Sequence, residues 1–295
     1  MTLFKKISFF TTCLALCFFL ISCRSALPQT QNSETVPKLN LSQQTPLIFL
    51  HGSGGSETDL IPFAEDFLSS SPEPVEILKV QISATNKITY LNNLLEPDSL
   101  PLIFVGFANN FADIEDWSQG LAVLLRDLKE TYHLNSANLI GFSNGGLAVT
   151  HYTELFGTKE GYPEIKKLVT IGAPYNDLEP LNDDATLNFS DKSKASEYLD
   201  IFLKPKSQLP PSLQVLAIAG DTGQNSDDIV PVSSALASRL IFPGEVAYYQ
   251  ERLALGPKAS HGGLITNNPD VNKWVSDFLF KLALDKTGNY FLEEN

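Results

Sequence analysis

The sequence is short of the residues that build disulfides and metal sites. Its 295 residues include three cysteines and four histidines. Cys13 and Cys17 lie in an apolar N-terminal stretch, so only Cys23 remains if that stretch is removed, which excludes an intramolecular disulfide. The histidines have no H-E-x-x-H or similar ligand spacing, so we expect no metal and no other cofactor. They are His51, His133, His151 and His261.

Positive charge is also scarce. The chain has 21 lysines and arginines against 34 aspartates and glutamates, a formal net charge of -13. A chain of this charge is repelled by nucleic acid and by anionic lipid surfaces. We therefore expect no nucleic-acid partner and no membrane binding through electrostatics.

The first residues have the features of a targeting segment. Lys5 and Lys6 precede an apolar stretch from Ile7 to Ile21, which is too short to span a bilayer comfortably. The tetrapeptide Leu20-Ile21-Ser22-Cys23 closes this stretch and resembles the lipobox of bacterial lipoproteins. We therefore predict a signal peptide over residues 1–22.

The resemblance implies cleavage before Cys23 and attachment of lipid to its sulfur, giving an exported, membrane-anchored lipoprotein of the bacterial cell envelope. Residues 23–45 are rich in Gln, Asn, Ser, Thr and Pro, which is typical of a flexible tether. The alternative is an ordinary secretory signal with an incidental cysteine, which also predicts export.

From Pro46 onward, apolar runs alternate with segments of helical period, which predicts an α/β domain over residues 46–286 with a mostly parallel central sheet flanked by helices. The predicted strands are Leu47–Leu50, Val75–Ile82, Leu102–Phe107, Asn138–Phe142, Lys167–Ile171, Gln214–Ala219 and Val246–Leu253. The predicted helices are Leu60–Ser69, Ile114–Tyr132, Asn144–Phe156, Ser233–Ile241 and Asp270–Leu284.

Two segments do not follow this alternation. Residues 175–211 form a long connection with apolar residues at helical spacing, so a small lid over the active site and a solvated surface excursion are both open. Residues 287–295 are predicted to form a polar tail.

The stretch from Gly141 to Gly146 carries the strongest functional signal. It places Ser143 between a predicted strand and a predicted helix, in the G-x-S-x-G pattern of the nucleophile elbow of an α/β-hydrolase. Glycines two residues before and after the serine permit a tight turn that exposes the hydroxyl. The alternative reading is that Ser143 only caps the helix.

A serine nucleophile needs a base and an acid to orient that base, and in this fold they follow in the order Ser, Asp or Glu, His. Three aspartates, Asp221, Asp227 and Asp228, lie in one loop after a predicted strand. Aspartate is common in turns, so all three remain candidates. His261 follows the next strand and is the expected base, with an exposed loop histidine as the alternative.

The oxyanion of an acyl-transfer intermediate needs two N–H donors. The backbone N–H of Asn144, next to the nucleophile, is one candidate, and that of Ser53, in the loop after the first strand, is the other. The glycines around Ser53 match neither dinucleotide-binding nor P-loop patterns, so phosphate binding is a weak alternative.

These motifs resemble the lipase-like α/β-hydrolases of the cell-surface hydrolase family of unknown function. The resemblance covers about Pro46 to Leu284, with the four blocks in the expected order. They are His51 to Ser56, Gly141 to Gly146, Ser226 to Ala235, and Ser260 to Leu264.

In that family the third block usually reads S-D-G-x-V-P, which implies that Asp227 is the triad acid. Asp228 replaces the usual glycine, so this block offers a second carboxylate next to Asp227. Asn144 stands where other hydrolases often have His, Met or Gln. We expect this difference to matter little because the backbone of the residue acts in the oxyanion hole.

We therefore predict a serine hydrolase that cleaves a carboxylic ester or related acyl bond through an acyl-Ser143 intermediate. The expected partners are a small-molecule or lipid-like acyl substrate and a membrane reached through the anchor at Cys23. The alternative is a non-catalytic surface lipoprotein that binds a hydrophobic ligand in a hydrolase-like pocket.

Overall fold

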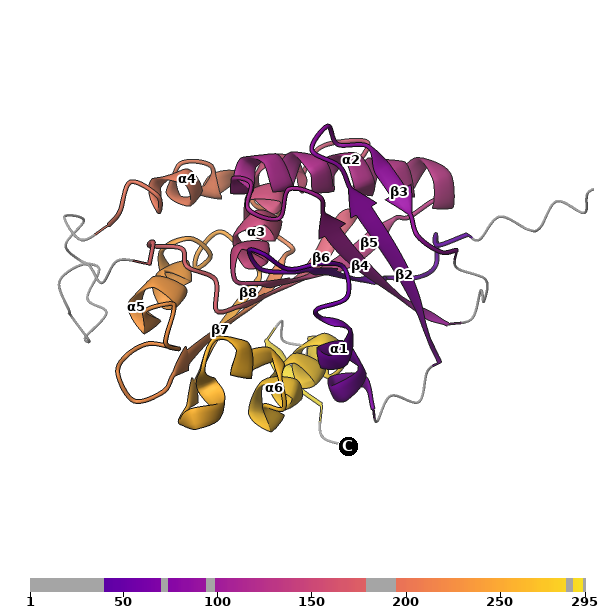
Figure 1. Ribbon diagram of the computed structural model, residues 1–295. Helices are drawn as coiled ribbons and strands as arrows, with labels where there is room; N and C mark the ends of the chain where they lie inside the picture. Colours follow the sequence, from indigo (N-terminus) through magenta and orange to yellow (C-terminus); the bar gives the residue numbers. More distant parts are fainter. Residues whose placement is uncertain (1–39, 70–73, 94–98, 179–194, 285–288, 294–295) are drawn as a thin grey trace, which may run out of the picture. The chain divides into compact units, whose positions relative to one another are not determined.

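The computed structural model of the chain describes residues 40–69, 74–93, 99–178, 195–284 and 289–293 (Figure 1). The predicted signal peptide and residues 23–39 of the predicted tether lie outside these ranges. Within the described ranges, no helix is both long enough and apolar enough to cross a membrane.

Eight strands form one sheet in the order β3-β2-β4-β1-β5-β6-β7-β8, parallel throughout except for the β2–β3 pair. Because parallel strands end at the same edge, the loops that follow them gather there. The predicted α/β class with a mostly parallel sheet is confirmed. The strands are β1 (Leu47–Leu50), β2 (Val75–Ile82), β3 (Ile88–Tyr90), β4 (Leu100–Phe107), β5 (Ser136–Phe142), β6 (Glu164–Ile171), β7 (Gln214–Asp221) and β8 (Tyr248–Leu255).

Helices cover both faces of the sheet, with α2 and α3 above it and α1 and α6 below it in Figure 1. The residues of β1 alternate between the two resulting cores, because successive side chains of a strand point to opposite faces. Ile48 packs in the cluster that contains α2 and α3, whereas Phe49 packs in the cluster that contains α1 and α6. The helices are α1 (Ile61–Leu68), α2 (Ile114–Tyr132), α3 (Asn144–Phe156), α4 (Asp200–Leu203), α5 (Val232–Ala235) and α6 (Pro269–Phe280).

Three secondary-structure predictions need correction. The short strand β3 pairs antiparallel with β2 at one edge of the sheet and was not predicted. The helix predicted at Ser233–Ile241 divides into α5 and a 3₁₀ helix at Leu236–Leu240. The hydroxyl of Ser238 donates to the backbone carbonyl of Ala235 there, and such local bonds compete with regular α-helix.

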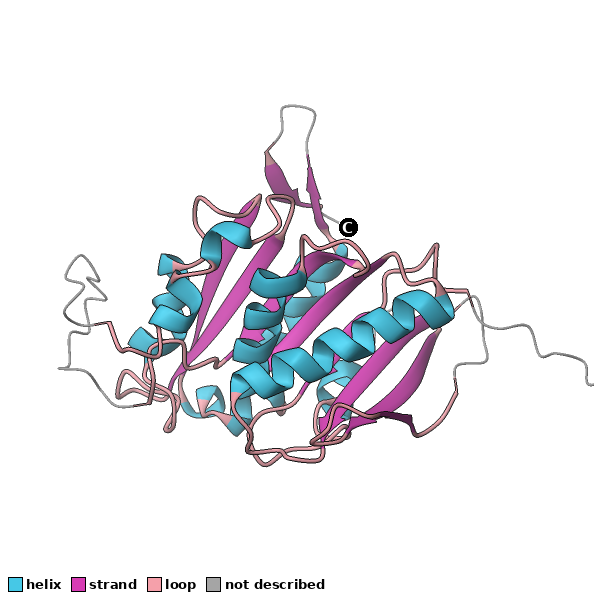
Figure 2. Ribbon diagram, turned by 90° about the horizontal axis from the view of Figure 1, so that it is seen from above, coloured by secondary structure: helices cyan, strands magenta, loops and turns pink. Residues whose placement is uncertain are grey.

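The third correction concerns the C-terminus. Helix α6 ends at Phe280, and β9 (Leu282–Leu284) pairs antiparallel with β10 (Tyr290–Leu292), the small hairpin at the top of Figure 2. Part of the predicted polar tail is therefore a strand. Pairing with a second strand outweighs the helical propensity of Leu-Ala-Leu, a non-local effect that local pattern does not reveal.

The predicted tether ends too late in the sequence. Leu41 is fully buried and its backbone N–H donates to the carbonyl of Tyr132 at 2.7 Å, while the hydroxyl of Thr45 bonds that of Ser136 at 2.9 Å. Residues 41–45 are therefore packed on the domain, with Leu41 buried in an apolar core.

The predicted lid over residues 175–211 remains a prediction, since residues 179–194 lie outside the described ranges. Its described part is not purely solvated. Leu199 and Phe202 are fully buried in the cluster that contains α3, and the Phe202 ring contacts that of Tyr175 edge-on at 5.2 Å.

Glu154 is a source of instability in α3. Its side chain is 1 % exposed, both carboxyl oxygens lack a hydrogen-bond partner among the described residues, and burial raises its pKa to about 9. The folded carboxyl keeps its proton where the unfolded one, with a pKa of 4.5, loses it. The free energy of unfolding therefore falls as the pH rises from the pKa of Glu154 in the unfolded chain to its pKa in the folded protein.

We expect Glu154→Gln to remove this pH dependence. Relative to the variant, the wild type should lose free energy of unfolding by on the order of 1 kcal/mol per pH unit between about pH 6 and about pH 8. Urea unfolding at these two pH values measures the difference. Glu160→Gln, at an exposed glutamate, is the matched control and should parallel the wild type; parallel curves for Glu154→Gln would contradict the interpretation.

Candidate active site

Ser143 lies in the turn between β5 and α3 with φ 54° and ψ -128°. A positive φ is strained for a residue with a side chain and is typical of functional turns. The hydroxyl makes no cap hydrogen bond to the helix, and lies 3.0 Å from His261 Nε2 instead. Its geometry therefore differs from that of a simple helix cap.

The two glycines of the motif are required by space. A Cβ on Gly141 would lie 2.4 Å from the carbonyl oxygen of Gly145, and a Cβ on Gly145 would lie 2.4 Å from those of Leu50 and His51. Neither glycine has a positive φ, so the strained backbone belongs to Ser143 itself. Gly141 therefore allows the turn to close on itself, and Gly145 allows it to pack against the end of β1.

The carboxylate of Asp227 and the ring of His261 form a buried pair. Asp227 Oδ2 lies 2.7 Å from His261 Nδ1, and the backbone N–H of His261 donates to the Asp227 carbonyl at 2.6 Å. The other carboxylate oxygen accepts from the N–H groups of Ile229 and Val230 at 3.0 and 2.6 Å. These bonds fix the carboxylate with one oxygen toward the imidazole.

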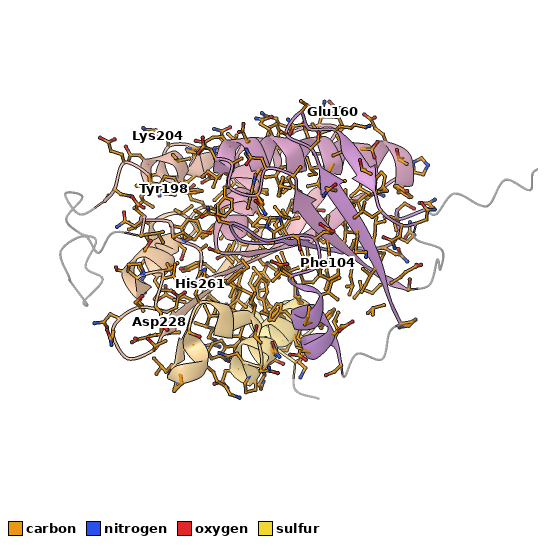
Figure 3. The ribbon with its side chains drawn as sticks, viewed as in Figure 1. Phe104, Glu160, Tyr198, Lys204, Asp228 and His261 are labelled. Carbon is orange, nitrogen blue, oxygen red and sulfur yellow. The ribbon has the colours of Figure 1, made fainter. Side chains whose placement is uncertain are left out.

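The other two aspartates of this loop serve local turns. Asp221 Oδ1 accepts from the N–H of Gly223 at 2.7 Å, and Asp228 Oδ1 accepts from the hydroxyl of Thr222 at 2.7 Å. Asp228 is exposed and lies farther out than His261 in Figure 3. Its φ of 76° is a left-handed conformation that favours glycine. This agrees with the S-D-G-x-V-P pattern, which has glycine at this position.

The loop after β1 lies directly against the serine. A Cβ on Gly52 would lie 2.9 Å from Ser143 Cβ, and the side chain of Asn144 donates to the Ser53 hydroxyl at 2.7 Å. Within the described ranges the backbone N–H groups of Ser53 and Asn144 have no acceptor. The Asn144 side chain therefore does more than was expected, because it ties the two donor-bearing segments together.

His51 holds the same loop from inside the protein. Its Nε2 accepts from the N–H of Phe107 at 3.2 Å, so Nδ1 carries the proton and donates to the Gly52 carbonyl at 2.6 Å. Burial lowers the pKa of His51, which favours this neutral form. The ring also packs edge-on against Trp117 at 5.0 Å.

Sequence reasoning missed two residues that shape this site. The Asn110 side chain donates to the Gly55 carbonyl at 3.0 Å, and the backbone carbonyl of Asn110 accepts from the N–H of Gly54 at 2.8 Å. Gly172 has φ 58°, and a Cβ there would lie 3.2 Å from both Asp227 Oδ2 and the His261 ring. A glycine directly after a predicted strand was the available signal for Gly172, whereas Asn110 lies in an unremarkable loop.

The structure thus brings Ser143, Asp227 and His261 together, with Ser53 and Asn144 beside the serine. Cys23 lies outside the described ranges. In the part of the chain that the structure describes, no group of three or more His, Cys, Asp or Glu side chains is arranged to hold a metal ion.

Gly145→Ala should destabilise the protein strongly, because the added methyl group meets two backbone carbonyls. We expect the free energy of unfolding to fall by about 3 kcal/mol or more. Gly262→Ala is the matched control, since a Cβ there meets nothing within 4 Å, and it should change stability by less than about 0.5 kcal/mol. Urea unfolding distinguishes the two, and equal stabilities would show that the turn has room to relax.

Comparison with known proteins places the chain in a family. Residues 34–282 match the family described as "Alpha/beta hydrolase of unknown function (DUF915)". The structure of the lin2722 gene product of Listeria innocua is similar, with 35% identity, a TM-score of 0.77, and coverage of 83% of this chain and 97% of that chain. A candidate cell surface hydrolase of Lactobacillus plantarum has 26% identity, a TM-score of 0.66, and coverage of 80% and 90%. No curated protein sequence matches. The chain belongs to the DUF915 family of alpha/beta hydrolases.

Proposed function

We propose that this hydrolase cleaves a carboxylic ester or related acyl bond through a covalent acyl-Ser143 intermediate. The observation that carries the proposal is one hydrogen-bonded path, from Asp227 Oδ2 through both ring nitrogens of His261 to the Ser143 hydroxyl, with spacings of 2.7 and 3.0 Å. Both distances lie in the range that a general base and its orienting acid require.

The proposed reaction has two halves. His261 Nε2 takes the proton of Ser143 as its oxygen attacks the acyl carbonyl, and returns that proton to the leaving group when the ester bond breaks. Water, activated by the same nitrogen, then hydrolyses the acyl-serine. Asp227 stabilises the imidazolium that forms in each half.

The N–H groups of Ser53 and Asn144 are the proposed oxyanion hole. Both are next to the nucleophile and lack an acceptor among the described residues, so they are free to donate to a developing negative charge. One such donor typically stabilises the transition state by about 3 kcal/mol. The contacts from His51, Asn110 and the Asn144 side chain would keep this loop in place before substrate arrives.

A non-catalytic binding protein is the competing function. The conformation of Ser143 favours the enzyme, since a φ of 54° costs about 1–3 kcal/mol and has no benefit for a binder. An apolar side chain next to the oxyanion loop supports an acyl substrate with a hydrophobic part. Phe111 is 76% exposed, and its ring lies against Gly54.

Export with a lipid anchor at Cys23 is a further part of the proposal. Its support is the lipobox-like sequence ending at Cys23 and the likeness to a candidate cell surface hydrolase. The anchor would hold a strongly acidic domain at a membrane to which its own charge does not draw it.

Substitutions in the Asp227–His261–Ser143 path should abolish or strongly reduce catalysis. We expect a fluorophosphonate to label the wild type and not Ser143→Ala, because only the activated hydroxyl reacts. Asp227→Asn should reduce kcat/KM for a nitrophenyl ester by roughly 10³-fold or more, since the histidine loses its orienting acid.

Asp228→Asn is the matched control and should retain activity within about threefold, because its carboxylate contacts Thr222 and not the histidine. Well-folded wild type that resists labelling would favour the binding protein. Loss of activity in Asp228→Asn alone would transfer the acid role to that residue.

The anchor is tested by labelling growing bacteria with radioactive palmitate. The wild type should incorporate the label, and Cys23→Ala should not, since the sulfur that carries the lipid is missing. Cys17→Ala, within the predicted signal peptide, should remain labelled. A wild type without label would leave an ordinary secretory signal as the explanation, and label retained by Cys23→Ala would show that another residue carries the lipid.

A further inference from the structure

A pocket of about 150 Å³ lies between β8, α6 and β10. Gln250 and Arg252 line it from β8, Lys273 and Trp274 from α6, and Leu292 from β10. None of the proposed catalytic residues contributes to it. It is therefore a separate concavity on the side of the sheet that α6 covers.

Arg252 has an unusual environment in this pocket. Its Nε is buried. Among the residues that the structure describes, this nitrogen has no hydrogen-bond partner and the guanidinium makes no ion pair. The guanidinium carbon lies 6.0 Å from the centre of the Trp274 ring, at the outer limit of a cation–π contact. A buried donor of a charged group without an acceptor is destabilising unless a ligand supplies one.

The neighbouring charges do not neutralise Arg252. Asp277, the acidic side chain of the pocket, is bonded by Lys273 and also lies 3.2 Å from Lys281. A second arginine near β8, Arg239 of the 3₁₀ helix Leu236–Leu240, is paired with Glu251 at 2.5 Å. In a chain with a net charge of -13, an unpaired arginine in a pocket beside a lysine is a local excess of positive charge.

We propose that this pocket binds an organic anion whose carboxylate or phosphate group lies on Arg252 and Lys273. The guanidinium fork suits two oxygens of such a group, and the ammonium adds charge. The Gln250 amide supplies a further donor, while Trp274 and Leu292 form an apolar wall for the rest of the ligand. The pocket is independent of the proposed acyl-serine chemistry.

Isothermal titration of the full domain with hexanoate and with inorganic phosphate tests this proposal. We expect saturable binding that Arg252→Gln weakens at least about tenfold, because charge-assisted bonds are lost. Trp274 fluorescence should change with the same midpoint, and this change should be absent in Trp274→Phe. Ser143→Ala should bind like the wild type, so failure of the hydrolase proposal would leave this result unaffected.

Arg126→Gln is the matched control, since it makes the same charge change on α2, where the arginine bonds Tyr162. It should bind both anions like the wild type. Lys273→Gln, at a side chain that is 68% exposed, provides a second variant that should fold and bind more weakly. No saturable binding, or equal binding by Arg252→Gln, would overturn the proposal.

Sedimentation with lipid vesicles distinguishes a lipid headgroup from a soluble anion as the ligand. Arg252-dependent sedimentation with phosphatidylglycerol vesicles, and not with phosphatidylcholine vesicles, would support the site with a lipid headgroup as ligand. Binding of the free anions without sedimentation would support it with a soluble ligand.

Discussion

The close approach of the Ser143 turn to the end of β1 is the constraint on which the site depends. The backbone of Leu50 and His51 leaves no room there for a Cβ on Gly145, and the turn itself leaves none for a Cβ on Gly141. This contact places Ser143 beside the loop that follows β1. The backbone strain of the turn lies at the serine, which has a positive φ. The position of the hydroxyl relative to its neighbours thus results from backbone packing and does not depend on long, mobile side chains.

Much of the fold could be predicted because its signals are local. The strand before Ser143 and the helices at Ile114–Tyr132 and Asn144–Phe156 have strong periodicity and clear breaks, and these helices have the predicted bounds. The hairpin of β9 and β10 could not be predicted, since each short strand depends on a partner that local pattern does not identify.

The candidate site was predictable in a similar, partial way. Serine and histidine stood out by motif and order, but residues alone left three aspartates open. Only the resemblance ranked Asp227 first. The feature that distinguishes Asp227 appears only in the folded chain, where hydrogen bonds from the N–H groups of Ile229 and Val230 leave its other carboxylate oxygen facing His261. Asn110 had no signal at all, since its contacts with the Gly54–Gly55 segment span 55 positions.

The 118 positions between Ser143 and His261 have a consequence for the nascent chain. The ribosome adds Ser143 to the chain well before His261, whose imidazole would remove the serine proton. The Ser143 hydroxyl therefore emerges with the low reactivity of an ordinary alcohol. Reactivity at the elbow would begin only when the C-terminal third has been synthesised and docked. Until then the proposed nucleophile would react with acyl donors no faster than an ordinary serine, and a chain truncated before His261 would remain inert.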